Sequence, residues 1–175
     1  MGLRDKWMAQ MSARMPDYGS VLTEALGDDA PCQAHALVVP AAYERNSGSG
    51  SDIGSALLKR AVDLASNSIA ENKHIGGDDG SIARSLPRVG DMLALALSPT
   101  SLSFWSFGIT GRELPPQRRI RLDRDVVRGL VGTGKRSQGG AGVARLSFVD
   151  GSFFDYRVVM APAPEFWVEA ESLTT

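Results

Sequence analysis

Residues 143–160, VARLSFVDGSFFDYRVVM, place two apolar runs on either side of an Asp-Gly pair. Side chains alternate between the two faces of a strand, so the pairing register decides whether a face is uniformly apolar or mixed. A two-residue turn at the Asp-Gly pair would set Leu146 opposite Asp155, which mixes apolar and charged residues. A three-residue loop, 149–151, sets Leu146 opposite Phe154 instead. We therefore predict a hairpin with a three-residue loop whose glycine is left-handed.

Residues 91–108, DMLALALSPTSLSFWSFG, show the same alternation. A four-residue loop at 98–101 pairs Leu97 with Leu102, and this register keeps the apolar residues of the two strands on matching faces. Trp105 then points to the opposite face. This segment predicts a second antiparallel hairpin.

The remaining pattern places strands and helices around these hairpins. Apolar alternation predicts about seven strands, one at 34–40 and six between residues 91 and 160, followed by a helix that begins near Pro164. Helical periodicity predicts a helix at 53–72 and a helical extension over residues 1–30. The chain is therefore expected to be an α+β protein with an antiparallel sheet and a C-terminal helix.

Four segments, LALALSPTSLSFWSFG, RRIRLDRDVV, ARLSFVDGSFFDY and PEFWVEA, resemble bacterial pleckstrin-homology-like (PH-like) domains. The shared layout is a strand pair, a short basic strand, a DG hairpin and a final helix, over roughly residues 90–172. The resemblance implies a PH-like barrel, or a strongly curled antiparallel sheet, at 33–172 with a capping helix whose Trp167 packs on it. The range 44–90 departs from that pattern, and we interpret it as a helical insertion after the first strand.

Composition restricts the partners and the compartment. The chain has 175 residues, 43% of them hydrophobic and 22% charged, with a formal net charge of −1. Such a balance provides no overall field that would collect nucleic acid or an anionic membrane. One cysteine, no run of about 20 apolar residues and no signal-peptide pattern predict a cytoplasmic protein.

The stretch GLVGTGKRS, 129–137, resembles the phosphate-binding loop G-x-x-x-x-G-K-[ST]. That loop requires a helix directly after its lysine and a Ser or Thr that binds magnesium. Here Arg136 occupies the Ser/Thr position, and the glycines that follow disfavour a helix. We therefore interpret the stretch as a glycine-rich hairpin loop rather than a nucleotide site.

The segment from Arg112 to Arg136 is basic. Eight basic and three acidic residues give it a net charge of +5 in a chain whose total is −1. Four of these residues are the candidate ligands for a phosphate group: Arg119, Arg121, Lys135 and Arg136. The alternative is a solvated strand face whose charges are balanced by acidic residues elsewhere. Nucleic acid is not expected, because aromatic residues do not interleave these charges.

The residues that could support catalysis or bind a metal are few. Cys32 and His35 form a C-x-x-H fragment, and His74 is the only other histidine. Tetrahedral zinc needs four ligands, and no spacing completes the set. A Cys-His nucleophile pair is formally open, but a structural role for both residues is favoured. We expect no cofactor, no metal and no enzymatic activity.

The leading functional hypothesis is a non-enzymatic binding module with a protein partner or a second copy of the chain. The surfaces expected to make that contact are the N-terminal Met/Trp helix and the helix 53–72. The alternative hypothesis is a binder of anionic phospholipid head groups or small phospho-ligands through the basic segment 118–136. The PH-like resemblance implies a binding scaffold but does not choose between these two functions.

Overall fold

The computed structural model describes residues 15–27, 31–42, 73–88, 92–108, 111–137 and 140–174. The predicted helix 53–72 and most of the predicted N-terminal helix lie outside these ranges. The strands are β1 Ala34–Pro40, β2 Ile75–Gly76, β3 Leu93–Leu97, β4 Ser101–Ser106, β5 Gln117–Asp123, β6 Val127–Arg136, β7 Gly142–Phe148 and β8 Phe153–Val158. The helices are α2 Tyr18–Leu26, α4 Ile82–Ser85 and α5 Pro164–Glu171, with 3-10 turns η2 Arg124–Val126 and η3 Ser172–Thr174.

The protein is an α+β structure built on one eight-stranded antiparallel sheet. The strand order is β5-β4-β3-β1-β8-β7-β6, and β2 pairs with β8 beside this path. No pairing joins β5 to β6 among the described residues, so these two strands are the edges of the sheet. The sheet is therefore not closed into a barrel.

The β7–β8 hairpin has the predicted register. Leu146 pairs with Phe154 and Ala144 pairs with Tyr156. The amide of Phe148 donates to the carbonyl of Ser152 at 2.9 Å, which leaves a three-residue loop. The glycine of that loop has φ +81°. The prediction from face matching is confirmed, because only this register keeps the large apolar side chains together.

The β3–β4 hairpin is confirmed in the same way. Leu97 pairs with Leu102 and Leu95 pairs with Phe104. Both faces of this hairpin are buried, since every residue of β3 and β4 is inaccessible to solvent. The two strands therefore contribute to two separate apolar layers rather than to one.

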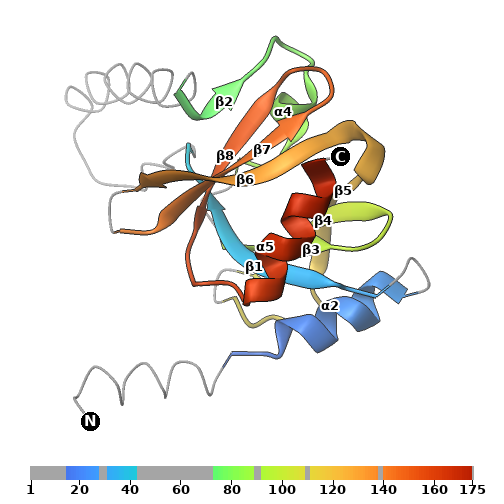
Figure 1. Ribbon diagram of the computed structural model, residues 1–175. Coiled ribbons are helices and arrows are strands. Elements are labelled where there is room, and N and C mark those ends of the chain that lie inside the picture. The colour runs from blue at the N-terminus through green and yellow to red at the C-terminus, as the bar shows by residue number, and fades with distance from the viewer. Residues whose placement is uncertain are drawn as a thin grey trace, which may run out of the picture.

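The larger apolar layer lies on the face of the sheet that α5 covers. Figure 1 shows α5 lying across this face. All seven long strands contribute to it, and Phe166 and Ala170 of α5 pack against it. Both edge strands reach the same cluster, so the sheet curls around it. Pro164 at the first position of α5 fits the helix start predicted from the sequence.

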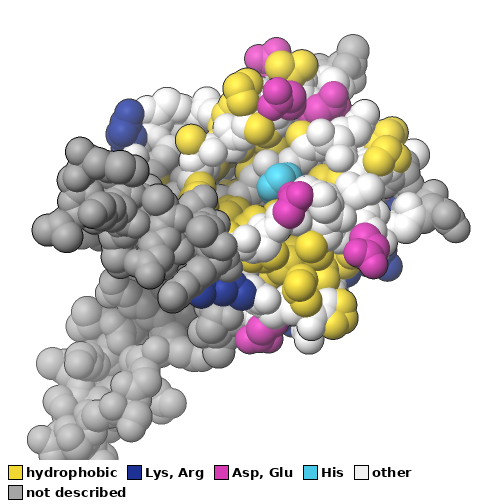
Figure 2. All heavy atoms as spheres, turned by 90° about the horizontal axis from the view of Figure 1, so that it is seen from below, with side chains coloured by type: hydrophobic (Ala, Val, Ile, Leu, Met, Phe, Trp, Pro, Cys, Tyr) yellow, Lys and Arg dark blue, Asp and Glu magenta, His cyan; other side chains and the backbone are white. Residues whose placement is uncertain are grey.

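The smaller layer lies on the opposite face and under α2. Leu22 of α2 packs there with Leu37 of β1, Ala94 of β3, and Trp105 of β4. Asp17 caps α2, because its side chain accepts a hydrogen bond from the amide of Ser20. The side of the molecule at which α2 lies shows hydrophobic side chains with acidic ones scattered between them (Figure 2).

Three features differ from the prediction or add to it. The sheet has one strand more than predicted, because β2 lies within the range 44–90 and pairs Ile75 with Phe154 of β8. The glycine-rich stretch 129–137 is not a loop, since β6 continues through Arg136. No helix among the described residues is long and apolar enough to cross a membrane.

Candidate functional site

The far end of β6 is a bulged strand. Gly132 pairs with Ala144 and Arg136 pairs with Gly142, so β6 holds two more residues than β7 over this interval. The hydroxyl of Thr133 donates to the carbonyl of Val143 at 2.8 Å. Gly134 has φ +71°, a conformation that glycine adopts without strain. The resemblance to a phosphate loop therefore comes from the bulge, and the chain after Lys135 is a strand and a hairpin turn.

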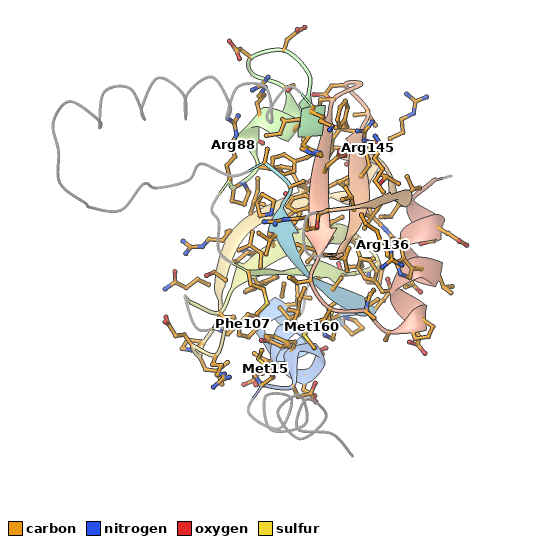
Figure 3. All side chains as sticks on the ribbon, turned by 90° about the vertical axis from the view of Figure 1, so that its left-hand side faces the viewer. Met15, Arg88, Phe107, Arg136, Arg145 and Met160 are labelled. Atoms are coloured by element: carbon orange, nitrogen blue, oxygen red, sulfur yellow. The ribbon has the colours of Figure 1, made fainter. Side chains whose placement is uncertain are left out.

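A pocket of about 590 Å³ lies between this hairpin end and α5, and Figure 3 labels two of its lining residues, Arg136 and Met160. One wall is the hairpin with Lys135 and Arg136. The other wall consists of Val158, Met160 and Trp167. No acidic residue lines the pocket among the described residues.

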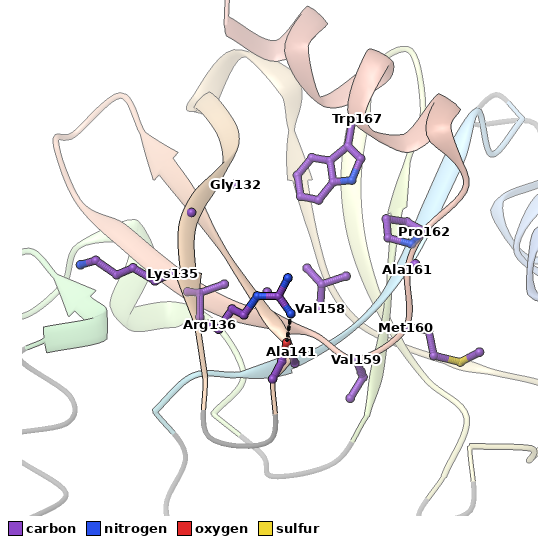
Figure 4. A pocket seen from close by; sticks show the side chains of 14 residues that line it. Gly132, Lys135, Arg136, Ala141, Val158, Val159, Met160, Ala161, Pro162 and Trp167 are labelled. Atoms are coloured by element: carbon purple, nitrogen blue, oxygen red, sulfur yellow. Dashed lines mark hydrogen bonds between the residues drawn. The ribbon is translucent and has the colours of Figure 1, made fainter. Parts of the chain in front are cut away.

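The two cations of the hairpin are placed differently. The Nη1 of Arg136 donates to the carbonyl of Gly140 at 3.4 Å, across the hairpin. The guanidinium lies on the pocket side of the hairpin, whereas the side chain of Lys135 runs away from it (Figure 4). Arg136 is therefore the cation presented to a ligand, and Lys135 adds positive potential at the rim.

Arg119 and Arg121 lie elsewhere. Both are exposed on β5, the opposite edge of the sheet from β6. Nη1 of Arg121 lies 3.7 Å from the carboxylate of Asp123. Neither arginine lines the pocket. The structure thus separates the four residues that the sequence grouped as one candidate site.

Another basic residue of the segment has a structural contact. Nη2 of Arg124 donates to the hydroxyl of Ser172 at 2.7 Å and to the carbonyl of Glu169 at 3.4 Å. A cation at the carbonyl end of α5 is also favourable for the helix dipole. Arg124 therefore fastens the corner between β5 and β6 to the end of α5.

Sequence reasoning missed the apolar half of the pocket. It assigned Trp167 to packing against the sheet, and the side chain does contact the larger layer while lining the pocket. Met160 follows β8 and is about half exposed, at 47%. The sequence carries no signal for this wall, because only the fold brings Met160 and Trp167 to the pocket that Arg136 lines.

In the Cys32–His35 fragment, burial disfavours the reactive thiolate form of the cysteine. Burial raises the pKa of the Cys32 thiol to about 11, so the thiol is protonated at neutral pH and is a weak nucleophile. The thiol donates to the carbonyl of Ala34 at 3.4 Å. Among the residues that the structure describes, no group of three or more His, Cys, Asp or Glu side chains could hold a metal.

The chain matches no protein-family model, no curated protein and no solved structure.

Proposed function

We propose that the protein is a non-enzymatic binding module and that its pocket takes a small anion with an apolar part. One observation carries this proposal: the guanidinium of Arg136 faces a wall formed by Val158, Met160 and Trp167. A ligand with one charged end and one apolar end complements both walls.

The two walls contribute differently to affinity. A guanidinium binds a carboxylate or phosphate through two parallel hydrogen bonds, which gives orientation and specificity. An exposed ion pair contributes little free energy, so the charge alone does not retain the ligand. Apolar contact with Trp167 and its neighbours supplies the larger part, at about 25 cal/mol per Å² removed from water. Inorganic phosphate is therefore a weak ligand in this proposal.

The binding surfaces predicted for a protein partner or an oligomer, the N-terminal helix and the helix 53–72, lie almost wholly outside the described residues. That function remains a hypothesis based on the sequence. The described part of the chain favours the alternative hypothesis, restricted to Arg136 and Lys135 and extended by the apolar wall.

A PH-like fold also remains a proposal. It is supported by the two antiparallel runs of strands joined through β1 and β8, and by a C-terminal helix that packs inside the curled sheet. The open edges at β5 and β6 and the added strand β2 depart from a closed seven-stranded barrel.

Calorimetric titration with octyl phosphate, octanol and inorganic phosphate tests the proposed function. Octyl phosphate should bind most tightly, because only this probe engages both walls. Arg136→Gln should weaken its binding about fivefold, which is the upper end of the range for an exposed ion pair. Arg121→Gln is the matched control on the other edge and should leave binding unchanged. Equal effects of the two variants, or equally tight binding of inorganic phosphate, would contradict the proposal.

A further inference from the structure

A second pocket, of about 390 Å³, adjoins the first. It lies between the start of α2, strand β1 and the segment that leads from β8 to α5. Three residues, Met160, Ala161 and Pro162, line both pockets. Met15, just before α2, and Met160 both line the second pocket and are labelled in Figure 3. The two pockets are therefore neighbours that have these three residues in common.

The second pocket differs from the first in charge. Among the described residues, its lining includes no lysine or arginine, and its apolar part includes Met15, Tyr18 and Leu37. Its two polar residues are Asp17 and His35. Burial lowers the pKa of His35, so its imidazole is predominantly neutral at neutral pH. The carboxylate of Asp17 accepts from the amide and hydroxyl of Ser20 and repels an anion.

We propose that the natural ligand is a single-chain amphiphile that occupies both pockets. Its anionic head group lies at Arg136, and its hydrocarbon chain crosses the Met160–Pro162 wall into the second pocket. This inference rests on the proposed function, because it uses the same head-group site. The charges give the direction of the ligand: Arg136 lines the first pocket, and the acidic residue Asp17 lines the second.

The chain-length dependence of binding follows from this arrangement. Each methylene that leaves water increases affinity by up to about fourfold, and by about twofold where one side of the chain stays exposed. A ligand restricted to the first pocket would show a gain that stops once that pocket is filled. A ligand that uses both pockets continues to gain as the chain lengthens.

The test compares butyl, octyl and dodecyl phosphate, each as the dissolved monomer below its micelle concentration. Ala163 lines only the second pocket and is exposed, so a larger side chain there fills the pocket without entering the core. Ala163→Trp should remove the gain between octyl and dodecyl phosphate and leave butyl phosphate binding unchanged. Ala163→Ser is the matched control and should retain the full chain-length dependence.

The possible outcomes separate the two proposals. If Arg136→Gln weakens butyl and octyl phosphate but the gain stops before dodecyl, and Ala163→Trp changes nothing, the head-group site stands and the second-pocket inference is overturned. If Arg136→Gln has no effect at any chain length, the proposed function itself fails. Binding to phosphatidylglycerol vesicles without binding of any monomer would also overturn the inference.

Discussion

Asp155 of β8 holds Arg145 of β7 through both carboxylate oxygens, with Nε at 2.7 Å from Oδ1 and Nη2 at 3.0 Å from Oδ2. Nδ1 of His74 lies 3.1 Å from the same Oδ2. The carbonyl of Asp155 accepts from the amide of Ala41 at 2.9 Å. One residue thus connects the end of β1, the approach to β2, and β7. Its side chain is almost fully buried, so these partners replace the water that would otherwise bind its carboxylate oxygens.

Replacement of that carboxylate should be costly. Asp155→Asn leaves the guanidinium of Arg145 without its counter-charge, and we expect the free energy of unfolding to fall by about 2 kcal/mol. Urea denaturation followed by circular dichroism measures this change. Asp123→Asn is the control, because Asp123 is 67% exposed and pairs with Arg121 at 3.7 Å. Equal losses in the two variants would contradict the buried ion pair as a source of stability.

The register of both hairpins could be predicted because each has one arrangement that keeps its faces uniform. Leu146 against Phe154 and Leu97 against Leu102 follow from alternation alone. Strand β2 gave no such signal: it has two residues, one of them glycine, and it exists because Ile75 pairs with β8. Its position depends on long-range contact rather than on local pattern.

The candidate site was predictable only in part, because long-range contacts rather than local pattern bring its residues together. Lys135 and Arg136 were identified as cations in a basic segment, but the sequence grouped them with Arg119 and Arg121. Strands next to each other in sequence lie at opposite edges here, because β5 and β6 end two separate antiparallel runs. The apolar wall at Trp167 comes from a segment 31 residues after Arg136, and no local pattern links the two.

Gly76 is required by a neighbouring aromatic ring. A β-carbon there would overlap the ring of Phe153. The guanidinium of Arg145 lies over the same ring, at 3.6 Å from its centre. We expect Gly76→Ala to destabilise the protein by about 1–3 kcal/mol, the usual range for overpacking. Chemical denaturation measures it. Gly132→Ala is the control, because in the described part of the chain no atom lies within 4 Å of the added carbon at that strand position.

A double variant shows whether the ring is the cause. Phe153→Leu should reduce the cost of Gly76→Ala, because the smaller side chain leaves room for the methyl group. If Gly76→Ala costs the same in both backgrounds, the overlap with Phe153 is not responsible.

His35 should make stability depend on pH. Burial lowers its pKa in the folded protein, whereas the unfolded chain keeps the ordinary value of about 6.5. The unfolded state therefore binds a proton more readily, and the free energy of unfolding falls as pH drops from above 6.5 through the folded pKa. Denaturation curves between about pH 8 and 5.5 should show a smaller decrease for His35→Gln than for the original protein.

The histidine can also be observed directly. An NMR titration should place the midpoint of His35 below that of the same residue in denaturant. A midpoint at or above the denatured value would refute this pH dependence. Ligands that fill the second pocket should lower the midpoint further, because they remove the remaining water around the imidazole.

Gly134 distinguishes the bulge from a phosphate loop. Its φ of +71° is the reason for a glycine, and no atom of the described residues lies within 4 Å of an added β-carbon. Asparagine tolerates this conformation, so Gly134→Asn should cost less than about 1 kcal/mol, while Gly134→Val should cost about 2 kcal/mol. Gly132→Val, in ordinary strand conformation, controls for the valine itself.

A phosphate loop needs glycine because the ligand approaches the backbone, so Asn would abolish binding there. Here Gly134→Asn should retain octyl phosphate binding, and loss of binding in a stable Asn variant would show that the backbone of the bulge itself contacts the anion.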